Sequence, residues 1–327
     1  MTAVMDQKQG KNFAMYNSDC VKFAQELPDN SIDFSIYSPP YSSLYVYSES
    51  AADMGNVDDD KAFCEQYRYL VKELYRVTRP GRLVAIHVKD LVYYQGSSER
   101  GTSGLRPFSD MCTQVHMEEG FDFHCRVSIF RDPVLERSKT NAHGLLWKTF
   151  KKDATFCRVG MPEYLILFRK WAKEGEEDLV KPVEHPAEDI PLICWQELAS
   201  PIWNVLNVDA WNFKPYQSGS GDFDLPATDV LNVKQAKDEN AEKHLCPMPL
   251  NITERALNLW TNAGDVVFSP FAGIGSEGVA TLRNNRKFIG TELNPVYYNQ
   301  AVKHLESVES TGTQTSIFDV LGVSHEL

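Results

Sequence analysis

A strand–helix–strand rhythm near each end of the chain is the strongest constraint on the fold. The apolar run Ile32–Tyr37 indicates a buried strand, apolar residues at helical spacing follow over Phe63–Tyr75, and Leu83–Val88 indicates the next strand. The order returns in the last third, with strands predicted at Val266–Phe268 and Phe288–Glu292. Such units build parallel sheets covered by helices. We therefore expect an α/β fold: a Rossmann-like mixed sheet with helices on both faces, in which the strands ending at Tyr37 and Phe268 are neighbours.

The turn after the strand Val266–Phe268 has the features of a nucleotide-binding loop. It reads Ser269-Pro270-Phe271-Ala272-Gly273-Ile274-Gly275 and precedes a predicted helix, while Glu292 ends the next strand. Glycines in such a turn let a ligand approach the backbone, and a carboxylate at the second strand's tip can hold both ribose hydroxyls. Gly278 stands two positions later than the third glycine of the dinucleotide fingerprint, which disfavours a nicotinamide dinucleotide and favours S-adenosylmethionine. Taken alone, the glycines would fit an ordinary tight turn between a strand and a helix, and Glu292 would fit a solvated glutamate at a strand end.

The first predicted strand ends at Ser38-Pro39-Pro40-Tyr41, a loop suited to methylating an aromatic amino group. The prolines cannot donate backbone hydrogen bonds and hold the loop extended. An aromatic amine is a poor nucleophile because its lone pair is delocalised into the ring. The Ser38 hydroxyl oxygen and the Pro39 carbonyl would accept the amino hydrogens and localise that lone pair, while Tyr41 would stack on an extruded base. The alternative is an ordinary proline turn with a core tyrosine.

A basic segment between the strands predicted at Phe123–Ile129 and Glu163–Phe168 is the part of the chain best suited to contact DNA. The whole chain has a net charge of -12, which is unfavourable for DNA because Lys and Arg must neutralise the phosphates. From Arg131 to Arg158, however, seven basic residues stand against three acidic ones. The DNA-binding residues expected here are Arg131, Arg137, Lys139, Lys148, Lys151 and Lys152. A solvated basic loop without a partner would explain the charge count equally well.

The rest of the composition argues against a metal centre, a disulfide framework and a membrane anchor. The seven cysteines are odd in number and never stand at Cys-x-x-Cys spacing, so we expect neither a zinc site nor a disulfide framework. The first residues lack the apolar core of a signal peptide, and no apolar run reaches bilayer length. We therefore expect a cytoplasmic protein without a metal or a membrane partner.

In the order of its motifs the sequence resembles the amino-methylating, S-adenosylmethionine-dependent DNA methyltransferases, in the group whose catalytic tetrapeptide precedes the cofactor-binding block. The segments that carry the resemblance are 17–41, 74–81, 244–250, 265–278 and 288–292. We expect a catalytic half over residues 1–122, a DNA-contacting and target-recognition region with flexible loops over 123–243, and a cofactor-binding half over 244–327. Residues 170–240 show little resemblance to the family.

Carried over position by position, the resemblance implies a cofactor site built from both halves of the chain. Asp19 would contact the adenine, Glu292 the ribose, and Phe271 with its neighbouring glycines the methionine part. The cofactor-binding residues implied are Asp19, Pro247, Pro249, Ser269, Pro270, Phe271, Ala272, Gly273, Gly275 and Glu292. The catalytic residues implied are Ser38, Pro39, Pro40 and Tyr41. The family usually has Asp at the position of Ser269, whose hydroxyl can still form hydrogen bonds.

The tetrapeptide also bears on which amino group is methylated. Ser-Pro-Pro-Tyr resembles the N4-cytosine enzymes, whereas Asp or Asn in its first position is more often found in N6-adenine enzymes. C5-cytosine methylation uses a Pro-Cys nucleophile, and the chain has no Pro-Cys dipeptide. We expect a site-specific N4-cytosine methyltransferase of bacterial or phage origin that acts on a flipped base in double-stranded DNA. N6-adenine methylation and DNA binding without turnover are the alternatives, and a homodimer and a restriction partner stay open.

Overall fold

The computed structural model describes residues 4–41, 54–55, 59–97, 101–133, 137, 146–185, 190, 192–203, 231 and 247–311. Its helices are α1 (Cys20–Glu26), α2 (Asp60–Val77), α3 (Phe108–Glu118), α5 (Trp147–Lys152), α6 (Leu192–Leu198), α7 (Leu250–Trp260), α8 (Ser276–Arg283) and α9 (Pro295–Thr311). Its strands are β1 (Val4–Gln9), β2 (Phe13–Ser18), β3 (Ile32–Tyr37), β4 (Thr78–Lys89), β5 (Leu91–Tyr93), β6 (Gly104–Arg106), β7 (Asp122–Ile129), β8 (Glu163–Arg169), β9 (Ile202–Trp203), β10 (Val266–Ser269) and β11 (Lys287–Glu292). Short 3-10 helices lie at Gln95–Ser97, Ala154–Phe156 and Glu177–Leu179.

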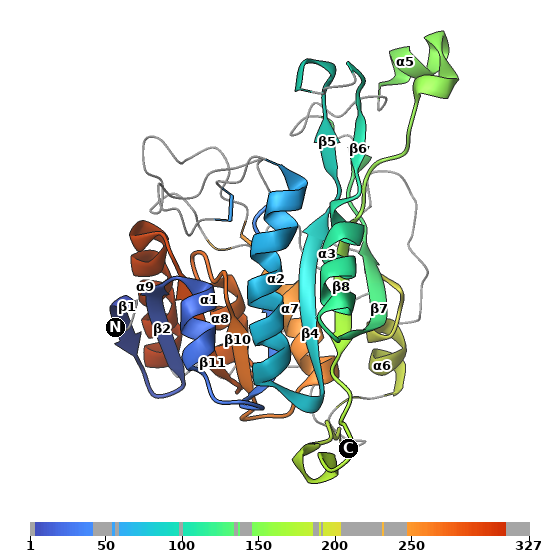
Figure 1. The fold of residues 1–327 in the computed structure, drawn as a ribbon. Helices are drawn as coiled ribbons and strands as arrows, with labels where there is room; N and C mark the ends of the chain where they lie inside the picture. Colours follow the sequence, from blue (N-terminus) through green and yellow to red (C-terminus); the bar gives the residue numbers. More distant parts are fainter. Residues whose placement is uncertain are drawn as a thin grey trace.

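One large mixed sheet organises the described residues (Figure 1). Its strand order is β1-β2-β11-β10-β3-β4-β8-β7-β9. The five strands from β2 to β4 in this order run parallel, while β1 and β8 run antiparallel to β2 and β4, respectively. The expected mixed α/β sheet is therefore confirmed. The strands β7, β8 and β9, which lie within residues 122–203, belong to this same sheet.

The order of the strands reverses between β3 and β10. The connection from β3 through α2 to β4 runs toward one side of the sheet, and the connection from β10 through α8 to β11 runs toward the other. Val267 and Phe268 of β10 pair with Phe34 and Ser35 of β3, so these strands are neighbours as expected. Open α/β sheets bind ligands at the carboxyl ends of their strands, beside such a reversal.

Helices cover both faces of the sheet (Figure 1). α1, α2 and α3 pack on one face, where α2 buries one side because its apolar residues recur at helical spacing. The residues that α2 buries are Phe63, Tyr67, Leu70, Val71, Leu74 and Val77. α7 packs on the other face against β3, β4 and β8, and α8 and α9 cover β2 and β11. The three-layer arrangement leaves the ends of the strands open.

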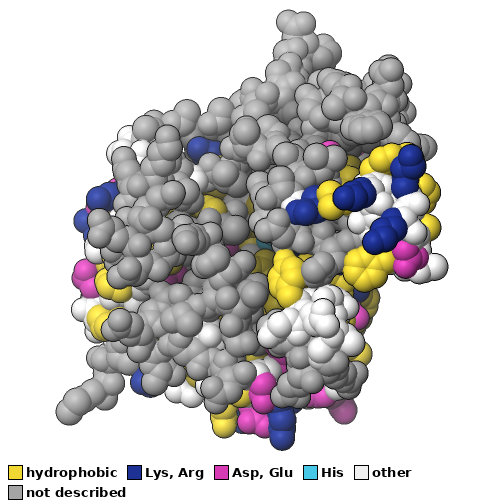
Figure 2. Space-filling model, turned by 90° about the horizontal axis from the view of Figure 1, so that it is seen from above, with side chains coloured by type: hydrophobic (Ala, Val, Ile, Leu, Met, Phe, Trp, Pro, Cys, Tyr) yellow, Lys and Arg dark blue, Asp and Glu magenta, His cyan; other side chains and the backbone are white. Residues whose placement is uncertain are grey.

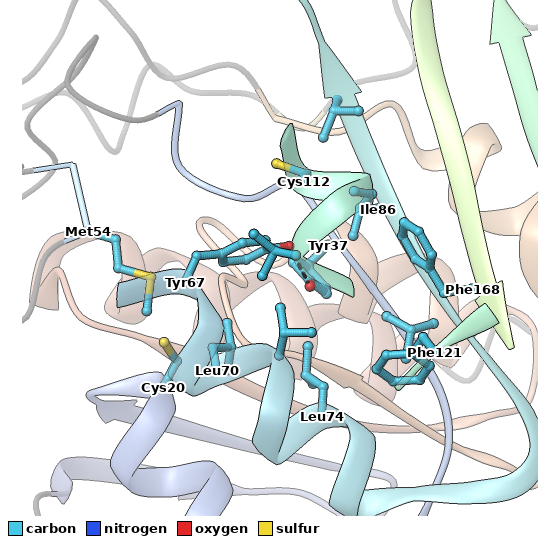
Figure 3. Packing of buried hydrophobic residues seen from close by; sticks show 14 of the residues in the cluster. Cys20, Tyr37, Met54, Tyr67, Leu70, Leu74, Ile86, Cys112, Phe121 and Phe168 are labelled. Carbon is cyan, nitrogen blue, oxygen red and sulfur yellow. Dashed lines mark hydrogen bonds between the residues drawn. The ribbon is translucent and has the colours of Figure 1, made fainter. Parts of the chain in front are cut away.

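A chain of buried hydrogen bonds crosses the core beside α2. The Oη atom of Tyr37 lies 2.8 Å from Oη of Tyr67 and 3.2 Å from Nε2 of His116, whose Nδ1 lies 2.8 Å from the Cys112 carbonyl oxygen. Figure 3 shows Tyr37 and Tyr67 facing each other among the buried hydrophobic residues around α2. Burial lowers the pKa of His116 to about 4, so its ring is neutral. Nδ1–H therefore donates to Cys112, and Nε2 accepts from the Tyr37 hydroxyl.

A buried ion cluster lies at the amino-terminal ends of the parallel strands, away from the carboxyl ends where such sheets bind ligands. The Asp265 side chain is fully buried and pairs with Arg82, whose side chain is only 1% exposed, and with Lys181 at 2.6 Å. Arg82 Nε also donates to the Asp33 carbonyl oxygen at 2.9 Å. Burial alone would raise the pKa of Asp265, but hydrogen bonds from Lys181 and Arg82 outweigh it and hold the pKa below its ordinary value. The cluster joins β10, β3 and β4 to the segment around Lys181.

Several elements have no clear pattern in the sequence. β2 gains its buried surface by pairing with the distant β11, with Phe13 opposite Phe288. α3 begins after Pro107, whose side chain cannot cap it, and the distant Asp90 accepts from the Ser109 amide instead. The β5–β6 hairpin forms a separate two-stranded sheet. No helix in the described part of the chain is long and apolar enough to cross a membrane.

Candidate functional site

Three neighbouring parallel strands end together at the predicted site. β3 ends at Tyr37, β10 at Ser269 and β11 at Glu292. Adjacent strands lie about 5 Å apart, so the three loops leave the sheet within about 10 Å of one another. The rings of Tyr37 and Phe271 are in contact, with their centroids 5.8 Å apart. The structure thus brings the Ser38–Tyr41 loop and the 269–275 turn together, as the sequence predicts.

The Glu292 carboxylate holds the turn in place. Its Oε2 accepts a hydrogen bond from the Gly273 amide at 2.9 Å, and its Oε1 accepts one from the Asn294 amide at 2.8 Å. Gly273 and Gly275 have φ angles of +51° and +91°, a left-handed conformation that favours glycine. A Cβ on Gly275 would also lie 3.2 Å from Cα of Ala301 in α9. The sequence therefore needs glycine at both positions.

The turn has room and unsatisfied polar groups for the cofactor that the resemblance implies. A Cβ built on Gly273 would meet no heavy atom of the described residues within 4 Å, so open space lies against this backbone. The buried hydroxyls of Ser269 and Ser276, at the two ends of the turn, have no hydrogen-bond partner in the described part of the chain. The same holds for both polar side-chain atoms of Asn251, which is also buried. Buried polar groups normally have partners, so this site fits a polar ligand.

The other residues implied for the cofactor lie at the same edge or next to it. Asp19 follows β2, which pairs with β11, and its Oδ1 caps α1 by accepting from the Val21 and Lys22 amides at 2.8 and 3.1 Å. Pro247 and Pro249 directly precede α7. Leu250, the first residue of α7, packs in the same apolar cluster as Ala272 of the turn.

Glu277, in the first turn of α8, is a buried carboxyl group that the sequence motifs do not single out. Burial raises the pKa of Glu277 to about 8, and the negative charge of Glu292 contributes to the rise. A protonated Glu277 lets α8 begin beside Glu292 without placing two carboxylates in one site.

The predicted base pocket lies on the other side of the turn. Ser38 is half-buried, and Pro39 and Pro40 are buried. The Tyr41 ring packs against the ring of Phe108 at the start of α3, with the centroids 5.7 Å apart. The tyrosine for which the sequence predicts stacking on a base therefore packs against the first residue of α3.

Three residues behind Ser38 form a polar chain that the sequence motifs do not reveal. Ser38 Oγ lies 3.3 Å from Nδ1 of His87 in β4, and Nε2 of His87 lies 2.9 Å from Oε2 of Glu163 in β8. Arg131, which follows β7, donates to the same Glu163 oxygen, whereas the sequence predicts a DNA contact for it. His87 could have been noticed as a polar residue inside the apolar strand Leu83–Val88. The positions of Glu163 and Arg131 could not, because the pairing of β4, β8 and β7 decides them.

The basic segment divides into internal and exposed parts. Arg131 is engaged by Glu163, Arg137 is half-buried, and Lys139 lies outside the described residues. We call residues 146–158 the basic arm; its exposed cations Lys148, Lys151 and Lys152 lie on α5, which projects from the body in Figure 1. The space-filling view shows Lys and Arg side chains interleaved with hydrophobic ones on this part of the surface (Figure 2).

Exposed aromatic residues accompany these lysines. Trp147 is 71% exposed and Phe150 50%, and their rings are stacked with centroids 5.2 Å apart. Phe156 is 56% exposed. In the described part of the chain no group of three or more His, Cys, Asp and Glu side chains is placed to hold a metal ion.

Comparison with known proteins identifies relatives over most of the chain. A family model described as DNA methylase, N6_N4_Mtase, matches residues 32–303. The orphan methyltransferase M.BamHII of Bacillus amyloliquefaciens is 24% identical over 287 residues, which cover 86% of this chain and 92% of that protein.

Two solved structures share the fold. A protein of Thermus thermophilus described as a DNA modification methylase, solved with S-adenosyl-L-methionine, superposes with a TM-score of 0.60 at 20% identity, covering 89% of this chain and 91% of its own. The cytosine-N4-specific PvuII DNA methyltransferase superposes with a TM-score of 0.57 at 14% identity, covering 94% of both chains.

Proposed function

Because this chain belongs to the N6/N4 DNA methylase family, we propose that it transfers the methyl group of S-adenosylmethionine to N4 of cytosine in specific sites of duplex DNA. Family membership supports DNA methylation with S-adenosylmethionine as methyl donor. The choice of cytosine as the methylated base and the roles of individual residues are proposals beyond family membership. The observation that supports the residue roles is the meeting of Ser38-Pro39-Pro40-Tyr41 with the 269–275 turn at one edge of the sheet. The choice of cytosine rests on the serine in the first position of the tetrapeptide.

S-adenosylmethionine, when bound, supplies a methyl group on a positively charged sulfur, which an amine can attack. Gly273 would present its backbone to the ligand, and Glu292 would accept hydrogen bonds from the ribose hydroxyls. Both Glu292 oxygens already accept one backbone amide and keep further lone pairs, so the carboxylate can hold the turn and a ribose together. The unpartnered hydroxyls of Ser269 and Ser276 would meet polar groups at the methionine end. A serine therefore suffices where the family usually has Asp.

The Ser38–Tyr41 loop would activate the target amine. The Ser38 hydroxyl oxygen and the Pro39 carbonyl oxygen would each accept one amino hydrogen, which draws the nitrogen toward a tetrahedral shape and localises its lone pair. Pro39 and Pro40 are buried and hold this carbonyl in place. Tyr41 would stack on the flipped base, backed by Phe108.

The basic arm would bind the DNA backbone. In the described part of the chain Lys148, Lys151 and Lys152 form no ion pair, so they are available to phosphates. Trp147 and Phe150 add exposed rings next to these charges, a combination suited to nucleic acid. We assign target recognition to segments of 123–243 that connect the strands, because β7, β8 and β9 are part of the sheet.

Mass spectrometry of nucleosides tests this function. DNA is incubated with the protein and S-adenosylmethionine labelled in its methyl group, digested, and analysed for labelled nucleosides. We expect labelled N4-methylcytosine, since Ser stands first in the tetrapeptide. Labelled N6-methyladenine instead would overturn the base assignment and keep the amino-methylating mechanism. Cofactor and DNA binding without any labelled nucleoside would indicate a binding protein of this fold.

A further inference from the structure

A continuous hydrogen-bonded chain leads from the predicted base pocket into the protein. It starts at Ser38 Oγ, passes through both ring nitrogens of His87 at 3.3 and 2.9 Å, and ends at the Glu163 carboxylate. Arg131 donates to the same Glu163 oxygen from the other side. His87 is buried, and the Glu163 and Arg131 side chains are 18% and 21% exposed. Two strands, the loop after β3 and the segment after β7 therefore contribute to one polar chain at the carboxyl edge of the sheet.

The charge on Glu163 decides the direction of these hydrogen bonds. Burial alone would raise the pKa of Glu163, but the hydrogen bond from His87 and the charge and hydrogen bond of Arg131 outweigh burial and hold it far below its ordinary value. An ionised carboxylate only accepts hydrogen bonds, so Nε2 of His87 carries the hydrogen. In the neutral imidazole Nδ1 is then an acceptor, and the Ser38 hydroxyl donates to it. This leaves the lone pairs of Ser38 Oγ directed at the base pocket.

We propose that His87 is a positioning residue for amino methylation: it orients the Ser38 hydroxyl as a hydrogen-bond acceptor and receives, through Ser38, the proton that the amine loses. This inference rests on the proposed function. Without a partner for its hydrogen, the Ser38 hydroxyl could rotate and point that hydrogen at the amine, which would oppose activation. His87 removes that alternative.

The proton transfer balances without any further reactant. The amine nitrogen forms a bond to the methyl carbon, the carbon–sulfur bond breaks, and its electron pair stays on sulfur. The alkylated nitrogen gives one proton to Ser38 Oγ while the Ser38 hydroxyl gives its own to His87 Nδ1. The resulting imidazolium faces the Glu163 carboxylate, which stabilises it. The proton leaves to solvent before the next turnover.

Two variants of His87 separate orientation from proton acceptance. In His87→Ala both are lost, and we expect kcat to fall about 100-fold while the Kd values for cofactor and DNA stay near those of the wild type. His87→Asn places a side-chain oxygen near the position of Nδ1, so it can still accept from Ser38 but cannot take a proton. It should recover part of the lost kcat. His124→Asn, at an exposed position in β7, is the matched control and should keep the wild-type kcat.

Nitrogen NMR of the protein without DNA tests the same arrangement independently of activity. In uniformly ¹⁵N-labelled protein near pH 8 we expect the His87 ring, identified by its loss in His87→Asn, to carry hydrogen on Nε2 and none on Nδ1. The Nδ1 shift should change in Ser38→Ala. A His87 ring with hydrogen on Nδ1, or a His87→Ala enzyme whose kcat stays within threefold of an active wild type, would overturn the inference. A wild-type protein that labels no nucleoside would instead contradict the proposed function, and the NMR result would still decide the orientation of Ser38.

Discussion

The ring of Phe271 lies 5.8 Å from the ring of Tyr37, centroid to centroid, and joins the 269–275 turn to the strand that precedes the predicted base pocket. Truncation in Phe271→Ala should weaken S-adenosylmethionine binding about fivefold, because the turn loses the support of a ring contact that contributes about 1 kcal/mol. Isothermal titration calorimetry measures the Kd. Phe271→Tyr keeps the ring and serves as the control. An unchanged Kd in Phe271→Ala would show that the contact does not support the turn.

Ser38 and Glu292 should affect different steps. Ser38→Ala should lower kcat about 100-fold or more with little change in cofactor Kd, since the proposed role of its hydroxyl is on the target amine. Glu292→Ala should mainly weaken cofactor binding, because the variant loses both the expected ribose contact and the hydrogen bonds to Gly273 and Asn294. Calorimetry and single-turnover methylation separate the two effects. Equal losses of cofactor affinity in both variants, with DNA binding intact, would contradict this division.

The basic arm should contribute to DNA binding at every sequence. Neutralising Lys148, Lys151 and Lys152 together to Gln should flatten the slope of log affinity against log salt by about two to three units, at about 0.9 per lost phosphate contact. Fluorescence titration at several salt concentrations measures the slope, and cofactor affinity should not change. If the slope stays the same, the DNA site lies elsewhere, and residues 195–243 are the next segment to test.

His116 should make stability depend on pH. Its pKa is about 4 in the folded protein, against an ordinary value of 6.5, because the ring is buried. Between these values the unfolded chain binds a proton that the folded protein does not, so stability falls as pH decreases from 6.5 to 4, by at most about 3 kcal/mol. Urea unfolding at pH 7 and pH 4.5 should show a smaller difference for His116→Gln than for the wild type. The raised pKa of Glu277 makes its own contribution to stability increase as pH decreases. This contribution is the same in the wild type and in His116→Gln, so it cancels when their pH-dependent differences are compared. Equal differences would exclude a neutral buried His116.

The ion cluster at the amino-terminal edge should matter for folding. Asp265→Asn leaves the buried Arg82 without its main counter-charge and should cost about 3 to 5 kcal/mol in the free energy of unfolding. Urea unfolding followed by circular dichroism measures the loss. Lys8→Ala breaks an ion pair whose side chains are 48% and 46% exposed, and should leave the midpoint near that of the wild type. Similar midpoints for Asp265→Asn and the wild type would mean that the cluster contributes little.

Local patterns in the sequence determined the α/β alternation and the two loops that are proposed to form the site. Buried parallel strands are continuous apolar runs, and glycine and proline end them at defined places, so β3, β10 and the turns after them can be recognised without a structure. The neighbouring positions of Ser38 and Gly273 follow from the same reasoning, because ligand-binding loops collect at the carboxyl ends of parallel strands.

Only the tertiary structure decided what lies behind those loops. His87, Glu163 and Arg131 meet because β4, β8 and β7 pair in one register, and the sequence carries no local signal for that register. β2 has its place beside β11 for the same reason, since a strand's partners are set by burial across the whole sheet. The sequence alone therefore determined which residues stand at the strand ends, and the register of the sheet decided which side chains lie next to them.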